Sequence, residues 1–195
     1  MHGLINKSIQ SFLRDTYGEA VWSDVVLAAD LPFGDFEAML TYEDDITQRV
    51  LAAAAIRLGR PPEGLLEDIG TYLVSHANNE GLRRLLRFAG LSYEDFLFSL
   101  EDLPDRTRLA VSDLDLPRLD LRQQGVNRFR LTCDAGLPGL GHVLVGVLRA
   151  MADDYGALVM LDHLGEGQEG EAIEITLIET EFAEGRTFEL GARAV

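Results

Sequence analysis

The spacing of apolar residues changes once along this chain, and the change restricts the fold that the chain can adopt. Up to Leu103 the apolar residues recur every three or four positions, as they do on one face of a helix. From Asn127 to Cys133 polar and apolar residues alternate, which is typical of a half-buried strand. Two later runs, Ala157–Leu161 and Ile173–Ile178, also read as strands. The sequence therefore predicts an α+β fold, in which an N-terminal helical lobe precedes a small antiparallel sheet of about four strands with packed helices.

Capping residues and helix breakers give the predicted boundaries. Gly59 and Pro61 end one helix, and Ser92 with Asp95 three residues later makes a capping-box-like start to another. Gly70 lowers the stability of its own helix but permits close packing there. The predicted helices are Gly3–Thr16, a segment around Trp22 to Val26, Asp44–Leu58, Glu63–His76, Gly81–Phe88, Ser92–Leu103 and Gly139–Tyr155. We expect a loop at Leu31–Phe36, a glycine-rich turn at Gly165–Gly170 and a last strand at Arg186–Leu190.

Length and composition favour one globular domain over residues 1–195, with a helical lobe at 1–62 and the helices and sheet at 63–195. The chain has 195 residues, of which 47% are hydrophobic, which is enough to bury a sizeable core.

The single cysteine, Cys133, excludes an internal disulfide and fits a reducing compartment. The start of the chain lacks the apolar run of a secretory signal, and no apolar run is long enough to cross a bilayer. We therefore expect a cytoplasmic protein.

The charge of the chain argues against polyanionic partners. It carries 17 basic and 33 acidic residues, a formal net charge of −16. Nucleic acids and anionic membranes are bound by Lys and Arg, so neither is an expected partner. The acidity is most simply a source of solubility.

Sequence patterns of catalysis are also missing. The acidic pairs Asp44–Asp45, Glu101–Asp102 and Asp153–Asp154 are neighbours on predicted helices, so their side chains point to different sides and read as solvated faces. No phosphate-binding glycine loop and no Gly-x-Ser-x-Gly motif occurs. We therefore expect a binding or regulatory domain and not an enzyme.

Several short strings, taken in order, resemble the haem nitric oxide/oxygen binding (H-NOX) family over nearly the whole chain. No single string is specific, but their order matches the family and agrees with the predicted α+β fold. The strings are Met1–Lys7, Phe12 with Tyr17–Gly18, Val21–Trp22, Leu65–Gly70, Leu85–Gly90, Phe96–Leu103 and Gly139–Gly146. The resemblance implies haem as cofactor and a role in sensing NO or O₂.

The resemblance also implies a histidine that holds the haem iron from the proximal helix. In this chain Leu103 is followed by Pro104 at that position, and no histidine occurs between Ala77 and Gly141. Proline has no lone pair to offer a metal, whereas a neutral imidazole does. Pro104 has a plainer interpretation as well, because a proline at this point is able to end the helix.

The family's Tyr-x-Ser-x-Arg clamp on the haem propionates is the second element implied by the resemblance. Counting back from Gly139, its positions hold Cys133, Ala135 and Leu137. An Arg fork and hydroxyl donors hold carboxylates, and these three side chains offer neither. A shift of register does not help, because there is no Tyr in residues 94–154 and no Arg in residues 131–148. A third element, the proline that distorts the haem, has a counterpart in Pro117.

Two interpretations follow from these losses. The first is an H-NOX scaffold whose haem ligation is lost and whose pocket is empty or holds another apolar ligand, lipid-like or tetrapyrrole. The second is a haem-binding gas sensor with a non-standard axial ligand, for which the candidates are His142, His76 and Cys133. His2 and His163 receive no role. For each candidate ligand a structural interpretation is simpler: a partly buried imidazole, a cation at a helix end, or a small buried side chain.

If the pocket persists, its lining should be apolar. The predicted lining residues are Ile5, Ile9, Leu73, Phe96, Leu100, Val143 and Val147. The resemblance further implies a separately encoded signalling partner, such as a histidine kinase or a cyclic-dinucleotide enzyme.

Overall fold

A computed structural model describes residues 1–88, 90–168 and 170–187 of the chain. Two compact units are distinguished, Met1–Ile69 and Gly70–Val195. Among the described residues, none of the helices combines the length and apolar character that crossing a membrane demands.

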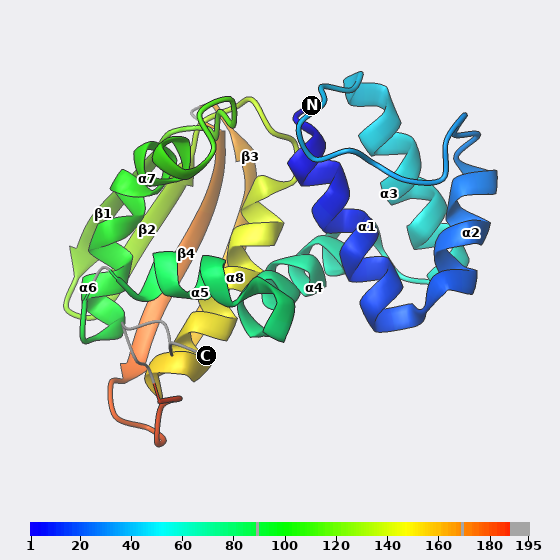
Figure 1. Ribbon diagram of the computed structural model, residues 1–195. Coiled ribbons are helices and arrows are strands. Elements are labelled where there is room, and N and C mark those ends of the chain that lie inside the picture. Colours follow the sequence, from blue (N-terminus) through cyan, green and yellow to red (C-terminus); the bar gives the residue numbers. More distant parts are fainter. Residues whose placement is uncertain (89, 169, 188–195) are drawn as a thin grey trace. The chain divides into compact units, whose positions relative to one another are not determined.

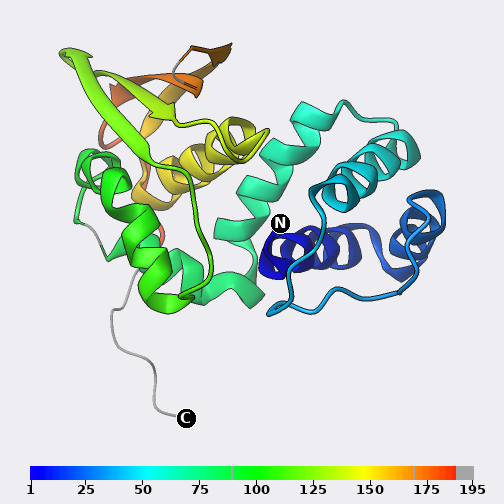
Figure 2. The ribbon, with the colours of Figure 1, turned by 90° about the horizontal axis from the view of Figure 1, so that it is seen from above.

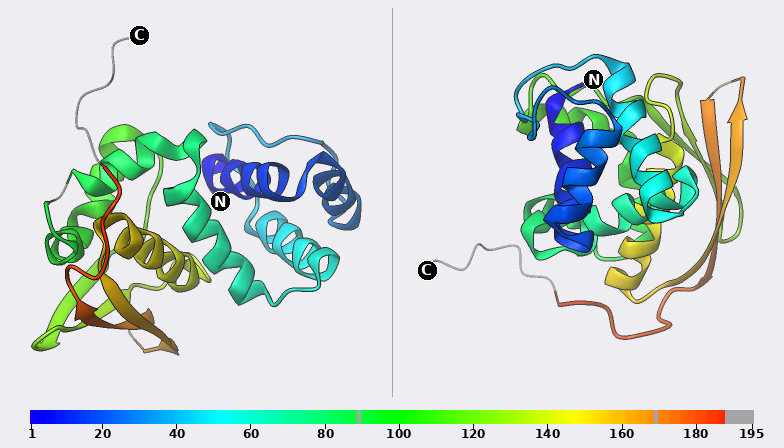
Figure 3. Two further views of the ribbon diagram at one scale, coloured as in Figure 1. Left: turned by 90° about the horizontal axis from the view of Figure 1, so that it is seen from below. Right: turned by 90° about the vertical axis from the view of Figure 1, so that its right-hand side faces the viewer.

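The N-terminal unit is helical, as the sequence predicts. It contains α1 (Gly3–Tyr17), α2 (Glu19–Ala28), α3 (Asp44–Leu58) and the first half of α4 (Pro62–Ser75). Helix α2 lies beside both α1 and α3 (Figure 3). The side chain of His2, to which the sequence assigned no role, caps α1 by accepting a hydrogen bond from the Leu4 amide at 3.1 Å. Residues 31–36 form a loop, as predicted.

The C-terminal unit is built on a four-stranded antiparallel sheet in the order β1-β2-β4-β3 (Figure 1). Its strands are β1 (Leu119–Gly125), β2 (Arg128–Cys133), β3 (Leu158–Gly167) and β4 (Gly170–Glu179). Helix α8 (Leu140–Tyr155) packs on one face of this sheet (Figure 2). The remaining helical segments of this unit are η1 (Ala77–Asn79), α5 (Glu80–Arg87), α6 (Tyr93–Phe98), η2 (Ser99–Asp102) and α7 (Leu103–Ala110).

Alternation along the strands places the core of this unit between the sheet and its helices. In β4, for example, Ile173, Ile175 and Leu177 are buried on the face that meets α8. Phe129, Leu131 and Cys133 of β2 belong to the same core. An antiparallel sheet covered on one side only leaves its other face to solvent, which explains the alternating pattern in the sequence.

The sheet differs from the prediction in three places. Strand β1 was not predicted, although it supplies an edge of the sheet. The stretch Gly165–Gly170 is not a long turn, because β3 continues to Gly167 and β4 begins at Gly170. In the expected strand Arg186–Leu190, the first two residues are not in a strand and residues 188–190 lie outside the described residues.

The helix predicted from Ser92 to Leu103 is also not continuous. The expected capping box is present, since the Ser92 side chain accepts from the Asp95 amide and the Asp95 side chain accepts from the Ser92 amide. Helix α6 then ends at Phe98, a 3₁₀ turn follows, and α7 begins at Leu103. Pro104 therefore lies in the first turn of a new helix and does not end one. Proline is favoured there because the first helical amides have no partner within the helix.

Close packing at Gly70 confirms the expectation from the sequence. A Cβ on Gly70 would lie 2.0 Å from the carbonyl oxygen of Val143 and 2.9 Å from the amide nitrogen of Val147, both on α8. We expect Gly70→Ala to lower the free energy of unfolding by about 1–3 kcal/mol through overpacking. Urea unfolding followed by circular dichroism measures this. Gly81→Ala is the control, because an added Cβ there meets nothing within 4 Å. Equal stability of the two variants would contradict the close approach.

Candidate functional site

Pro104, which the resemblance places at the family's iron-ligand position, is buried at the start of α7. Two residues further along α7, the side chain of Arg106 forms hydrogen bonds with other helical segments. Its guanidinium donates to the carbonyls of Leu85 at 3.1 Å and Ser99 at 2.8 Å, and so ties α7 to α5 and to the 3₁₀ turn η2. Partial burial lowers the pKa of Arg106 from its usual value, although Asp102 and Tyr155 oppose the shift. This neighbourhood offers hydrogen-bond donors but no metal ligand at position 104.

The three positions that match the propionate clamp have different surroundings. Cys133 is buried in the core of the C-terminal unit, Ala135 is exposed, and Leu137 is half-buried. Burial, with Glu171 and Asp134 nearby, raises the pKa of the Cys133 thiol to about 12. The side chain is therefore a neutral thiol near neutral pH, and its Sγ contacts the Asp134 carbonyl at 3.7 Å.

Pro117 does lie beside the segment that follows β2. A Cβ built on Gly136 would be 3.7 Å from Cγ of Pro117, and the Asp134 amide donates to the Arg118 carbonyl at 3.0 Å. The structure thus brings together Pro117 and residues 133–137, which the resemblance matches to the family's distorting proline and propionate clamp.

The seven predicted pocket-lining residues are divided between the two units. Ile5 and Ile9 are on α1 of the N-terminal unit. The other five belong to the C-terminal unit, where Phe96, Leu100 and Val147 are in the hydrophobic core. Leu73 and Val143 are half-buried. A shared pocket lined by these seven residues stays a prediction.

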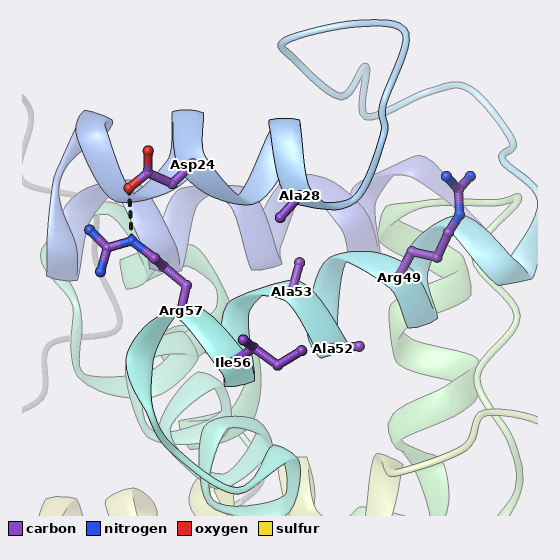
Figure 4. A pocket seen from close by; sticks show the side chains of 7 residues that line it. All are labelled: Asp24, Ala28, Arg49, Ala52, Ala53, Ile56 and Arg57. Atoms are coloured by element: carbon purple, nitrogen blue, oxygen red, sulfur yellow. Dashed lines mark hydrogen bonds and ion pairs between the residues drawn. The ribbon is translucent and has the colours of Figure 1, made fainter.

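A groove in the N-terminal unit lies between α2 and α3 and has a volume of about 330 Å³ (Figure 4). Ala28, Ala53 and Ile56 line its middle, and arginines stand at both ends. Arg57 donates to Asp24 at 2.7 Å, and Arg49 donates to the Ala29 carbonyl at 2.7 Å. None of the predicted pocket-lining residues borders this groove.

A cluster of three potential metal ligands forms where α8 meets the sheet. His142 on α8, His163 on β3 and Glu171 on β4 each place one ligand atom within 4.8 Å of the others. The two imidazoles stack with centroids 3.9 Å apart, and His163 Nε2 lies 3.0 Å from Glu171 Oε2. We call these residues the His-His-Glu cluster. From the sequence, His142 was interpreted as a partly buried imidazole or as a candidate haem ligand, and His163 was given no role.

The burial of the Asp154 carboxylate was also not predicted from the sequence. The pair Asp153–Asp154 was expected on a solvated face, and this is wrong for Asp154, which is 0% exposed at the end of α8. Arg83 of α5 contacts its carboxylate at 2.8 Å, and Arg87 contacts it at 3.5 Å. Asp153 is exposed, so the two neighbours do point to different sides. Arg83 and Arg87 stand at i and i+4 on α5, so they share a helix face and one acid can contact both.

Comparison with known proteins gives a consistent match. The sequence model of the haem-NO-binding (HNOB) family matches residues 2–163. Soluble guanylate cyclase 89Db of Drosophila melanogaster is 22% identical over 168 residues, which cover 86% of this chain and 25% of the cyclase. Soluble guanylate cyclase gcy-35 of Caenorhabditis elegans is 31% identical over 104 residues, covering 53% of this chain and 15% of the cyclase. The chain spans about a quarter or less of the length of these relatives.

Solved structures of H-NOX proteins share the fold. The H-NOX protein of S. oneidensis in the Fe(II) ligation state matches with a TM-score of 0.78 at 16% identity, covering 93% of this chain and 98% of that chain. The H-NOX protein of T. Tengcongensis matches with a TM-score of 0.75 at 15% identity, covering 92% and 99%. At such identities the likeness concerns the fold, and the side chains of this chain have to be judged on their own.

Proposed function

Because the chain belongs to the haem-NO-binding (H-NOX) family, we propose that it is a sensory or regulatory domain in which the usual haem ligation has been lost. The proposal rests above all on Pro104, which the resemblance places at the iron-ligand position and which lies in the first turn of α7. Proline offers iron no lone pair. The residues present therefore do not fit haem held in the family's usual way.

The electrostatics of the clamp segment support the same proposal. Cys133 pairs across strands with Glu171, and Asp134 follows it in the chain, so acidic groups flank this segment. The amides of Gly139 and Gly141, at the start of α8, already donate to the Glu171 carboxylate at 2.8 and 3.1 Å. A propionate in this neighbourhood would meet negative charge and amides that another carboxylate occupies.

The neutral thiol of Cys133 supports it too. Thiolate, and not thiol, is the form that binds a metal. Since burial and neighbouring acids raise the pKa of Cys133 to about 12, ligation of iron by this residue would require deprotonation of a buried thiol. We propose that the pocket is empty or binds another apolar ligand. We further propose that the chain acts on a separately encoded signalling protein, such as a histidine kinase or a cyclic-dinucleotide enzyme, and has no catalytic activity of its own.

A hemin titration of the full chain tests the proposal. We expect no stoichiometric complex and, after reduction, no Soret band that shifts on addition of NO, because neither ligand nor clamp is present. Absorption spectroscopy at increasing hemin concentration is the measurement, with a haem-binding H-NOX protein as the positive control. One equivalent of tightly bound hemin with an NO-dependent shift would overturn it and indicate a gas sensor with a non-standard ligand.

Single substitutions would then identify that ligand. His142→Ala and Cys133→Ala are each compared with the unmodified chain in the same titration. Loss of the spectrum in one variant would assign the axial ligand to that residue. An unchanged spectrum in both would exclude these two candidates and leave His76 as the next to be substituted.

A further inference from the structure

We propose that the His-His-Glu cluster is a binding site for a divalent first-row transition metal ion such as Zn²⁺, with His142, His163 and Glu171 as ligands. The inference does not depend on haem. Two imidazoles and one carboxylate are a common donor set for such ions, and three protein ligands leave a further coordination position open.

The sheet register brings the carboxylate and one imidazole together. Alternation in β4 puts Glu171 on the same face as Ile173 and Ile175, which is the face that meets α8. Strands β3 and β4 pair with His163 opposite Ile173, and the register shifts between His163 and Glu166. The shift lets His163 reach Glu171, with Nε2 and Oε2 3.0 Å apart.

Neighbouring backbone groups hold both of these ligands in place. The Glu171 carboxylate accepts from the amides of Gly139 and Gly141, at the positive end of the α8 helix. Hydrogen bonds from neighbouring groups to a ligating carboxylate orient it in known metal sites. His163 Nδ1 accepts from the Gly165 amide at 3.2 Å, which fixes the imidazole ring in the metal-free chain. Glycine is needed at position 141, since a Cβ would lie 2.5 Å from Glu171 Oε2 and 2.6 Å from His163 Nε2.

The ligand atoms are close to the spacing that an ion requires. Tetrahedral Zn²⁺ with bonds near 2 Å separates its donors by about 3.4 Å. His163 Nε2 and Glu171 Oε2 are already within that distance at 3.0 Å, and one ligand atom of His142 lies within 4.8 Å of the ligand atoms of the other two residues. An ion must lie near the plane of each imidazole it binds, and the stacked rings are tilted by only 23°. Binding therefore requires the His142 ring to turn and move inward.

The proton on His163 must also move. Because Nδ1 accepts from Gly165, the neutral ring carries its proton on Nε2 and shares it with Glu171. A metal ion takes the place of that proton between Nε2 and Oε2. The proton moves to Nδ1, which gives up the bond from the Gly165 amide, and no net proton is released. The Gly165 amide that loses this acceptor lies in the irregular part of β3, between His163 and Glu166, where Gly165 has a φ of +82°.

Metal titration of the chelator-treated full chain, without haem, tests the site. We expect one equivalent of Zn²⁺ to bind, measured by competition with a chromophoric chelator. We expect Co²⁺ to give visible d–d bands at the same stoichiometry. His142→Ala and His163→Ala should each weaken Zn²⁺ binding by about tenfold or more, since even changes in the groups that support a ligand cost 10–100-fold. His76→Gln, which alters a histidine of the same unit outside the cluster, should leave binding unchanged.

A ligand swap separates coordination from a merely structural role. His142→Cys retains a metal-binding side chain, so it should bind more tightly than His142→Ala and add a thiolate charge-transfer band to the Co²⁺ spectrum. The proposal is overturned if no equivalent of metal binds. It is also overturned if His142→Ala and His163→Ala bind as the unmodified chain does, or if His142→Cys shows no thiolate band. Since hemin is absent, these outcomes are independent of the hemin titration.

Discussion

Replacing Asp154 by Asn should lower the free energy of unfolding by about 3–5 kcal/mol, the usual cost of removing one partner from a buried ion pair. The carboxylate is 0% exposed and faces Arg83, whose side chain is only 7% exposed. Arg87 lies 3.5 Å from the other carboxylate oxygen, and its guanidinium also stacks over the Tyr155 ring at 3.9 Å. An amide keeps the shape of the side chain but not its charge, so the buried Arg83 and the half-buried Arg87 lose the carboxylate that they share, and Arg83 is left with Glu80 at 3.2 Å.

The same acid joins the end of the described chain to the C-terminal unit. The Asp154 carbonyl accepts from the Arg186 amide at 2.9 Å, and Arg83 donates to the Thr187 carbonyl at 3.2 Å. Loss of the Asp154 charge should therefore release residues 183–187 as well as loosening α5 from α8. Peptide-resolved hydrogen exchange should show faster exchange in these segments than in α1 to α3.

Asp153→Asn is the matched control for this prediction. It removes the same charge one residue earlier, from an exposed side chain, and should change stability by no more than about 0.5 kcal/mol. Urea unfolding of both variants, followed by circular dichroism, gives the comparison. Similar midpoints for the two variants would show that the Asp154 ion pairs contribute no net stability.

The parts of the fold that the sequence predicted are those with a long, strong period. Helix α8 and strands β2 and β4 carry their apolar residues at regular intervals, so both type and position could be predicted. Strand β1 was missed because only Leu119 and Leu121 alternate before the polar stretch that ends at Gly125. An edge strand with exposed outer residues gives too short a pattern to recognise.

The His-His-Glu cluster could not be predicted for a different reason. Its three residues come from three elements, and no two of them stand at a ligand spacing in the sequence. The irregular register between His163 and Glu166 brings them together, and register irregularities depend on tertiary packing. The predicted loss of the family's iron ligand and clamp, in contrast, needs no structure, because it concerns residue types at positions that the resemblance gives.

Pro104 illustrates how both kinds of information combine. The resemblance to the family predicts that proline replaces the iron ligand, and the sequence also allowed the interpretation that proline ends the helix. The structure supports a third arrangement, in which the chain passes through a 3₁₀ turn and restarts as α7 with Pro104 in the first turn. Proline stabilises such a start through its fixed φ angle. The residue therefore suits the backbone it occupies.

Phe96→Ala should also destabilise the protein strongly, by about 3–5 kcal/mol in the free energy of unfolding. Phe96 is 0% exposed, and its ring lies 5.6 Å from that of Tyr93 and 6.1 Å from that of Tyr155. Truncation leaves a cavity among aromatic neighbours, and Tyr93 is held in place by the bond from its hydroxyl to the Leu148 carbonyl. Incomplete relaxation around the cavity makes the cost exceed the transfer free energy of the ring alone.

This variant also separates two roles for Phe96, since the residue is both a core member and a predicted lining residue of a ligand pocket. Truncating a side chain in a tightly packed core creates a new cavity and lowers the free energy of unfolding by the full amount. Truncating one that borders an unfilled pocket lowers it less, because part of the space is already empty. Phe88→Ala, at a 73% exposed phenylalanine, is the control and should change stability by no more than about 0.5 kcal/mol. Urea unfolding decides between the roles: a loss below about 1.5 kcal/mol for Phe96→Ala would contradict the packed core and favour an open pocket beside α6.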